Sequence, residues 1–168
     1  MRYTIKHTLN TTVDTFWKKI FFDPEYNEKL FKNRLKFDVY EVLALEHKPD
    51  GSVYRKIDCA PPIEMPSIAK KFFGDSTGYI ETGLYDPKTG RFNTDIQPKV
   101  GADKIQMRIS IWAEPRGDKQ IERFVDVEGS VKIFGIGKIV EGMLESNTRE
   151  SYDIAADFTN KWVVEKAL

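Results

Sequence analysis

The sequence is poor in the residues that form disulfides and metal sites. It contains one cysteine, Cys59, and two histidines among 168 residues. A single cysteine cannot form an internal disulfide, and a zinc site built from cysteine and histidine takes about four such ligands. We therefore expect no internal disulfide and no metal, and the sequence predicts no other cofactor.

The sequence also lacks an excess of charge and a long apolar run. Lys and Arg together number 26 and Asp and Glu together number 26, so the formal net charge is zero. Balanced charge gives no electrostatic footprint for nucleic acid. No segment approaches the ~18 consecutive apolar residues of a membrane-spanning helix, and residues 1–12 have no apolar signal-peptide core. We expect a cytoplasmic protein with no nucleic-acid partner and no integral membrane segment.

Apolar residues are nevertheless present in sufficient number for a hydrophobic core. Hydrophobic residues make up 40% of the chain and aromatic residues 12%, which excludes general disorder. At ~100–200 residues per domain, this length fits one domain. Because no linker, internal repeat or low-complexity tract interrupts the chain, we predict a single domain over residues 1–168.

The order of predicted elements is strand, two short helices, six further strands and one long helix. Alternating polarity predicts a strand over 2–9, and helical spacing predicts the two helices after it, the second capped by Asp23 before Pro24. Turns rich in Pro and Gly then separate alternating segments, which indicates antiparallel hairpins. These strands are expected at 37–46, 53–60, 78–85, 91–97, 105–113 and 120–129, with a short helix at 67–73.

The C-terminal part predicts the longest helix. No proline occurs after Val131, and apolar residues recur there at three- and four-residue steps. The stripe expected to face the sheet consists of Ile136, Val140, Met143, Ile154 and Phe158.

Several local sequences accompany this order of elements. They are His7 before Leu9, the run Thr12–Trp17, Met65-Pro66 with Lys70 and Gly74, the run Gly135–Glu141, and Asp157-Phe158-Thr159 before Trp162. The chain resembles the START-like (SRPBCC, helix-grip) superfamily, which includes birch-pollen-allergen-type proteins and polyketide cyclases. These details are similar to a mainly bacterial branch known as a domain of unknown function.

The resemblance implies an α+β helix-grip fold. In that fold a curved antiparallel sheet of about seven strands wraps a long C-terminal helix, and two short helices follow the first strand. It further implies a cavity that binds or transports a hydrophobic small molecule, such as a lipid, isoprenoid or polyketide-like compound. No catalytic signature is matched, so no catalytic residue is implied, and we expect binding rather than catalysis.

Alternation divides each predicted strand into an inner and an outer face. The inner faces carry five polar residues among aliphatic ones, namely His7, Glu41, Arg55, Glu81 and Arg123. Apolar cavities with a few convergent polar groups are the usual form of small-molecule sites. We expect Arg55, Glu41, His7 and Glu81 to orient the polar end of a ligand, with Arg55 suited to a carboxylate or phosphate. The apolar lining is predicted from Met107, Ile109, Val140, Met143 and Phe158.

A structural explanation of the same residues stays open. Arg55 and Glu41 would pair across neighbouring strands, a contact worth about 0.2–1 kcal/mol. The inner set of residues 37–45 is the hardest to assign, because both faces of that segment carry apolar side chains. We predict Phe37, Val39, Glu41, Leu43 and Leu45 on the inside.

Two other functions stay open beside ligand binding. A cyclase- or aromatase-type enzyme would use the same cavity and predicts an enclosed acid or base with a shifted pKa. A protein-interaction module, with a protein partner, predicts a filled interior and an exposed apolar patch. The segment Met65–Phe73 is either a lid in transient contact with ligand or membrane, or a helix packed on the sheet edge.

Overall fold

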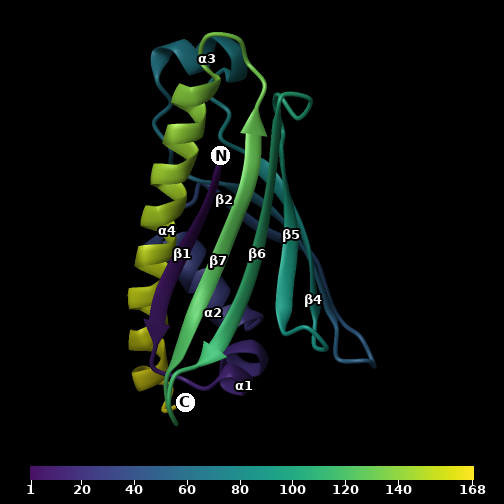
Figure 1. Cartoon of the computed structure of the whole chain (residues 1–168), viewed down its shortest axis with the longest axis vertical. Coiled ribbons are helices and arrows are strands. Elements are labelled where there is room, and N and C mark those ends of the chain that lie inside the picture. Colours follow the sequence, from purple (N-terminus) through teal and green to yellow (C-terminus); the bar gives the residue numbers. More distant parts are fainter.

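The strands form one curved antiparallel sheet in the computed structural model, which describes residues 1–168 (Figure 1). The strand order is β1-β7-β6-β5-β4-β3-β2, so the first strand pairs with the last and all other neighbours are consecutive in the chain. The strands are β1 (Arg2–Leu9), β2 (Val39–His47), β3 (Val53–Ala60), β4 (Tyr79–Asp86), β5 (Arg91–Pro98), β6 (Ile105–Pro115) and β7 (Ile121–Val131).

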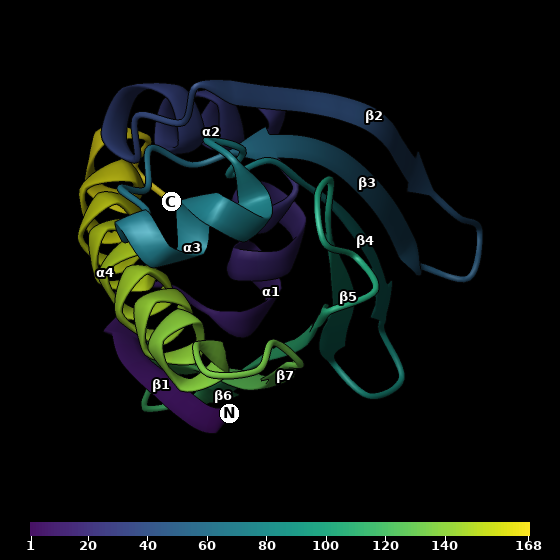
Figure 2. The same ribbon diagram turned by 90° about the horizontal axis from the view of Figure 1, so that it is seen from above.

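The helices lie on the concave side and at the ends of the sheet. They are α1 (Val13–Thr15), the π-helical η1 (Phe16–Phe21), α2 (Pro24–Glu28), the π-helical η2 (Lys29–Arg34), α3 (Ser67–Phe73) and α4 (Gly137–Glu165). Seen from above, the sheet curves around the interior, and α4 lies along the open side between β1 and α2 (Figure 2). Asp23 caps α2 as predicted, because its carboxylate accepts a hydrogen bond of 2.7 Å from the Tyr26 amide.

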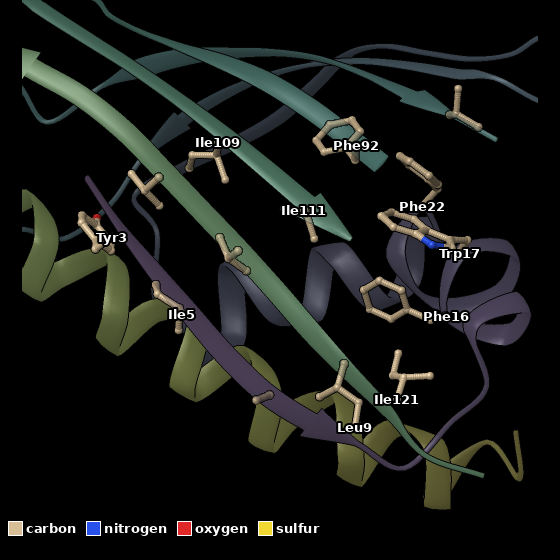
Figure 3. Close-up of a cluster of buried hydrophobic side chains, with 14 residues drawn as sticks. Tyr3, Ile5, Leu9, Phe16, Trp17, Phe22, Phe92, Ile109, Ile111 and Ile121 are labelled. Atoms are coloured by element: carbon tan, nitrogen blue, oxygen red, sulfur yellow. The ribbon is translucent and has the colours of Figure 1, made fainter. Parts of the chain in front are cut away.

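The largest buried cluster joins the first helical segment to the sheet (Figure 3). Phe16 and Trp17 of this segment stack edge to face, with ring centroids 4.9 Å apart. They pack with inner-face residues of β1, β5, β6 and β7, among them Leu9, Phe92 and Ile111. This cluster fixes α1 and η1 against one end of the sheet.

The outer face carries a row in which two stacked aromatic rings lie between two cations. Trp112 and Phe124 lie opposite each other on β6 and β7 and stack at 4.9 Å with an interplanar angle of 4°. Arg91 lies 3.9 Å over the Trp112 ring, and Lys6 lies 5.0 Å over the Phe124 ring. The row therefore links β1, β7, β6 and β5 on the outer face.

The predicted fold class is confirmed, including the seven strands, the two helical segments after β1 and the long C-terminal helix. The inner set predicted for residues 37–45 is wrong in part. The register between β2 and β3 shifts between Val42 and Ala44, so Tyr40 and Leu45 lie opposite the inner-face residues Cys59 and Arg55. Glu41 lies opposite Asp58 and is exposed, because strict alternation cannot continue through a β-bulge.

Candidate functional site: an apolar cavity with a polar wall

A cavity of about 230 Å³ lies between the sheet and α4. Of the 34 residues that line it, 22 are hydrophobic, so most of its surface offers no hydrogen bond to water. On the sheet side, β6 contributes alternate residues that include Met107 and Ile109, while the first turns of α4 contribute Val140 and Met143. An apolar cavity of about 150 Å³ binds benzene, so this volume is sufficient for a small apolar ligand.

Two of the polar residues of α4 that line the cavity form hydrogen bonds with their own helix. Asn147 donates from Nδ2 to the Met143 carbonyl at 2.8 Å, and Thr148 donates from Oγ1 to the Leu144 carbonyl at 2.7 Å. These two polar groups are therefore already bonded within α4 and add little polarity to the cavity wall.

An ion pair on the inner face of β3 and β4 is the main polar feature of the opposite wall. Nη2 of Arg55 donates to Oε1 of Glu81 at 2.6 Å, and the two side chains are only 7% and 11% exposed. Burial lowers the pKa of the Arg55 guanidinium, but the adjacent Glu81 carboxylate outweighs this effect and raises it. The Arg55 guanidinium therefore stays charged inside the protein.

Aromatic rings hold the Arg55 guanidinium in place. It lies 4.9 Å from the ring centroids of both Phe21 and Phe92. Phe92 reaches this position by crossing Gly83, the residue opposite Arg55, where a Cβ atom would lie 2.2 Å from the Phe92 ring. Glycine at position 83 is thus a condition for the stacking.

Tyrosine and cysteine side chains near the pair stay protonated. Burial, and secondarily the Glu81 carboxylate, raise the pKa of Tyr152. Burial also raises the pKa of Cys59 to about 12, so its thiol is not a reactive nucleophile. Because Tyr152 of α4 lines the cavity, its protonated hydroxyl is a hydrogen-bond donor in the same space.

A second arginine, Arg123 of β7, lines the cavity from the side of β1. Its Nη2 donates to His7 Nδ1 at 2.9 Å and to the Tyr152 carbonyl at 3.0 Å. His7 Nε2 lies 2.7 Å from Asp153 Oδ1, so the neutral imidazole accepts from Arg123 and donates to Asp153. Burial, together with the positive charge of Arg123, lowers the pKa of His7, which is consistent with this neutral form.

A family model described as "Protein of unknown function (DUF2505)" matches residues 4–163. The chain belongs to this family. No curated protein matches the sequence.

Solved structures show the same fold as this DUF2505 member. Norcoclaurine synthase from Thalictrum flavum is 21% identical, with a TM-score of 0.67 over 98% of this chain and 88% of that chain. The Zhui aromatase/cyclase from Streptomyces sp. R1128 is 9% identical, with a TM-score of 0.69 over 100% and 96%. A START superfamily protein from Mycobacterium smegmatis is 15% identical, with a TM-score of 0.58 over 98% and 97%. The START-like assignment is therefore confirmed at the level of the fold.

The structure brings six of the predicted ligand residues to the cavity wall. They are Arg55, Glu81, Met107, Ile109, Val140 and Met143. The other three lie elsewhere: Glu41 is on the outer face, His7 lies behind Arg123, and Phe158 packs between Tyr26 and Trp162 at 5.3 and 5.8 Å. For Glu41 the predicted orientation is wrong, for the bulge described above.

The main residue that sequence reasoning missed is Tyr152. It continues the helical spacing of Val140, Leu144 and Thr148, but the predicted stripe omits it because that stripe contains only residues without a polar group. Tracing the stripe by position rather than by residue type would have found it.

The segment Met65–Phe73 has one side on the cavity and another in solvent. Met65 and Phe73 line the cavity and Ala69 is fully buried, whereas Ile68 and Phe72 are 42% and 48% exposed. None of the helices, including the 29-residue α4, combines the length and the apolar character of a membrane-spanning helix.

Proposed function

We propose that this protein binds and carries a hydrophobic small molecule in the cavity between the sheet and α4. The observation that carries the proposal is the cavity itself, about 230 Å³ in volume with a lining that is mainly hydrophobic. Ordinary cores are packed with few voids larger than a water molecule, so a cavity of this size is typical of a ligand site rather than of a packed core. Met107, Ile109, Val140 and Met143 would contact the apolar body of the ligand.

The polar end of the ligand would lie toward Arg55, Glu81 and Tyr152. These residues bring a cation, an acceptor and a protonated hydroxyl to one otherwise apolar space. Such a small convergent set fixes the orientation of a ligand that apolar contacts alone would leave free to rotate.

The cavity favours ligand binding over a protein-interaction module, which predicts a filled interior. A cyclase-type enzyme is the second candidate, because Tyr152 and Glu81 bring a proton donor and a carboxylate to the same space. Replacing Tyr152 with Phe distinguishes the two: a carrier loses part of its affinity and has no turnover to lose, whereas an enzyme that uses this proton still binds its substrate but loses turnover.

Native mass spectrometry of the freshly purified protein, followed by denaturing extraction, tests the carrier proposal. Met143→Trp fills the cavity from α4 and should remove the adduct seen with the unmodified protein. Ile139→Trp is the matched control, since Ile139 lies one turn earlier on the same helix and is 49% exposed. An adduct that survives Met143→Trp would contradict the proposal. So would an apo protein whose melting temperature no lipid, isoprenoid or polyketide-like compound raises.

Transient contact with a membrane would serve ligand exchange in such a carrier. Ile68 and Phe72 on α3 and Phe134 in the β7–α4 connection are exposed, Phe134 fully, and both segments lie at the same end of the molecule (Figure 1). Exposed apolar side chains beside a cavity are suited to the headgroup boundary. Phe72→Asp with Phe134→Asp should abolish co-sedimentation with vesicles that contain phosphatidylglycerol, and co-sedimentation of this variant would contradict the contact.

A further inference from the structure

The ionised side chains that line the cavity do not balance. They are Arg55, Arg123 and Glu81, two cations and one anion. Glu81 lies against Arg55, at 2.6 Å, so this pair is neutral as a unit. The cavity wall is therefore left with the positive charge of Arg123.

The partners of Arg123 do not offset that charge. The two acceptors of its Nη2 are neutral: the His7 imidazole and the Tyr152 carbonyl. The nearest carboxylate in this chain of contacts, Asp153, lies on the far side of the imidazole and is 69% exposed to solvent. Arg123 itself is 4% exposed, and its Nε is buried without any acceptor. A guanidinium cannot lose its proton under ordinary conditions, so the chain itself leaves this buried charge unbalanced.

The surroundings of Arg123 include a second donor. Its guanidinium lies 5.1 Å over the ring of Tyr152, whose protonated side chain also lines the cavity. An oxyanion held here would accept hydrogen bonds from a guanidinium and a phenol, and bonds to charged groups are the stronger class.

We infer that the natural ligand is a compact amphiphile with one negative charge, its carboxylate or equivalent oxyanion held by Arg123. The inference rests on the proposed carrier function and specifies its ligand class. The volume of about 230 Å³ fits a medium-chain or one- to two-ring acid rather than a long lipid with two chains. Arg55 and Glu81, already paired with each other, would contact uncharged polar groups at the same end of the ligand.

A series of probes with one tail and three head groups tests the inference. Octanoate, 1-octanol and octylamine are titrated by calorimetry at pH 7.5 and low salt, and 2-naphthoate and 2-naphthol repeat the comparison with a ring. Because a hydrogen bond to a charged group contributes about 1.5–3 kcal/mol, we expect each acid to bind about 10–100-fold more tightly than its alcohol. Octylamine should bind most weakly.

Variants then assign the preference to one residue. Arg123→Met should bring the acid and the alcohol to equal affinity, whereas Arg108→Met removes the same charge from the outer face and should leave the preference intact. The double variant Arg55→Met with Glu81→Met removes the neutral pair and should retain the preference, so the assignment stays testable if Arg123→Met does not fold.

Three results would overturn the inference. Equal affinity of acid and alcohol in the unmodified protein would overturn it while leaving the carrier function in place. Loss of the preference in the double variant would move the anion from Arg123 to Arg55. Binding of none of the five probes would count against the carrier function itself.

Discussion

Two arginine–carboxylate pairs on opposite faces of the same sheet show how strongly position decides the meaning of a contact. Arg55 and Glu81 join β3 to β4 at 2.6 Å, and Arg108 and Asp95 join β6 to β5 at 2.8 Å. The inner pair is 7% and 11% exposed, whereas the outer pair is 69% and 65% exposed. The same type of ion pair, with a similar distance between its charged atoms, is thus buried on one face of the sheet and exposed to water on the other.

The difference teaches that the inner pair is kept for a reason other than stability. Desolvation of two charges costs free energy that their attraction only partly returns, so a buried pair is weak evidence for stabilisation. An apolar replacement would fill the same wall at less cost. The inner pair lines the cavity in which we propose that a ligand binds, while the outer pair lies in solvent.

Breaking the inner pair should have the largest effect. Glu81→Ala leaves the Arg55 guanidinium buried without a counter-ion, and we expect the free energy of unfolding to fall by about 3–5 kcal/mol. Urea denaturation followed by tryptophan fluorescence measures this. A loss below about 1 kcal/mol would mean that water reaches Arg55 and that the two pairs are energetically alike.

Adding one carbon beside the inner pair should have the next largest effect. The Cβ of Gly83→Ala would lie 2.2 Å from the Phe92 ring, so the ring must shift away from the Arg55 guanidinium. We expect a loss of about 1–3 kcal/mol by overpacking. Gly142→Ala, in α4 with nothing within 4 Å and no positive φ, is the control and should not lose stability. If Gly83→Ala loses no more than Gly142→Ala, the Phe92 ring moves aside without cost and the expectation is wrong.

The outer face should respond to the loss of a stacked cation, but modestly. Arg91→Ala removes the guanidinium 3.9 Å over Trp112, and we expect a loss of about 0.5–1 kcal/mol. Thermal denaturation of this variant and of the unmodified protein at equal ionic strength gives the difference. A loss as large as that of Glu81→Ala would show that the outer row is as important as the inner pair.

Acidification should destabilise the folded protein through the protonation of His7. Burial lowers the pKa of His7 in the folded protein, so the unfolded chain binds more protons between the two pKa values. The stabilisation is complete above the unfolded value of about 6.5 and is lost as the pH falls toward the folded value. His7→Gln should flatten the dependence of melting temperature on pH in this range, whereas His47→Gln, on exposed His47, should not. An identical slope in all three proteins would contradict the assignment.

Removing the outer ion pair should have the smallest effect of all. Asp95→Asn takes a charge from a pair exposed to solvent on both sides, and we expect no measurable change in the melting temperature. The matched inner change, Glu81→Gln, should lower it clearly. A similar response of both variants would remove the contrast between the faces.

Most of the fold could be predicted because its strands alternate cleanly. Strands such as β1 and β6 have one face packed on the interior and one in water, and their inner residues follow from period two alone. Segment 37–45 fails because both of its faces are apolar, so nothing in the pattern marks the bulge between Val42 and Ala44. Alternation in the sequence predicts which residues of a strand share a face, but it does not locate the β-bulge at which the pairing register shifts.

The site was less predictable because pairing in three dimensions decides it. Arg55, Glu81 and Arg123 were placed on the inner face by alternation, but their partners depend on which strands are neighbours. Arg55 and Glu81 pair because β3 and β4 are neighbours in the sheet and both side chains point to its inner face. Glu41 of β2 points to the outer face because the register of β2 shifts at the β-bulge. The neutral hydrogen-bond partners of Arg123 are present because α4 packs beside β1. The sequence of a single element does not predict this packing.

The pairing of β1 with β7 also delays the completion of the sheet while the chain is being synthesised. Thr8 and Glu122 face each other in the sheet, and so do Leu9 and Ile121, which means that β1 finds its strand partner only after most of the chain exists. At about 5–20 residues per second, roughly 110 residues take about 5–20 s to follow β1 out of the ribosome. During that interval the first strand is an unpaired edge with a hydrophobic face, the kind of segment on which aggregation begins. The basic side chains of Arg2 and Lys6, which alternate with its apolar residues, are placed where they would discourage such pairing.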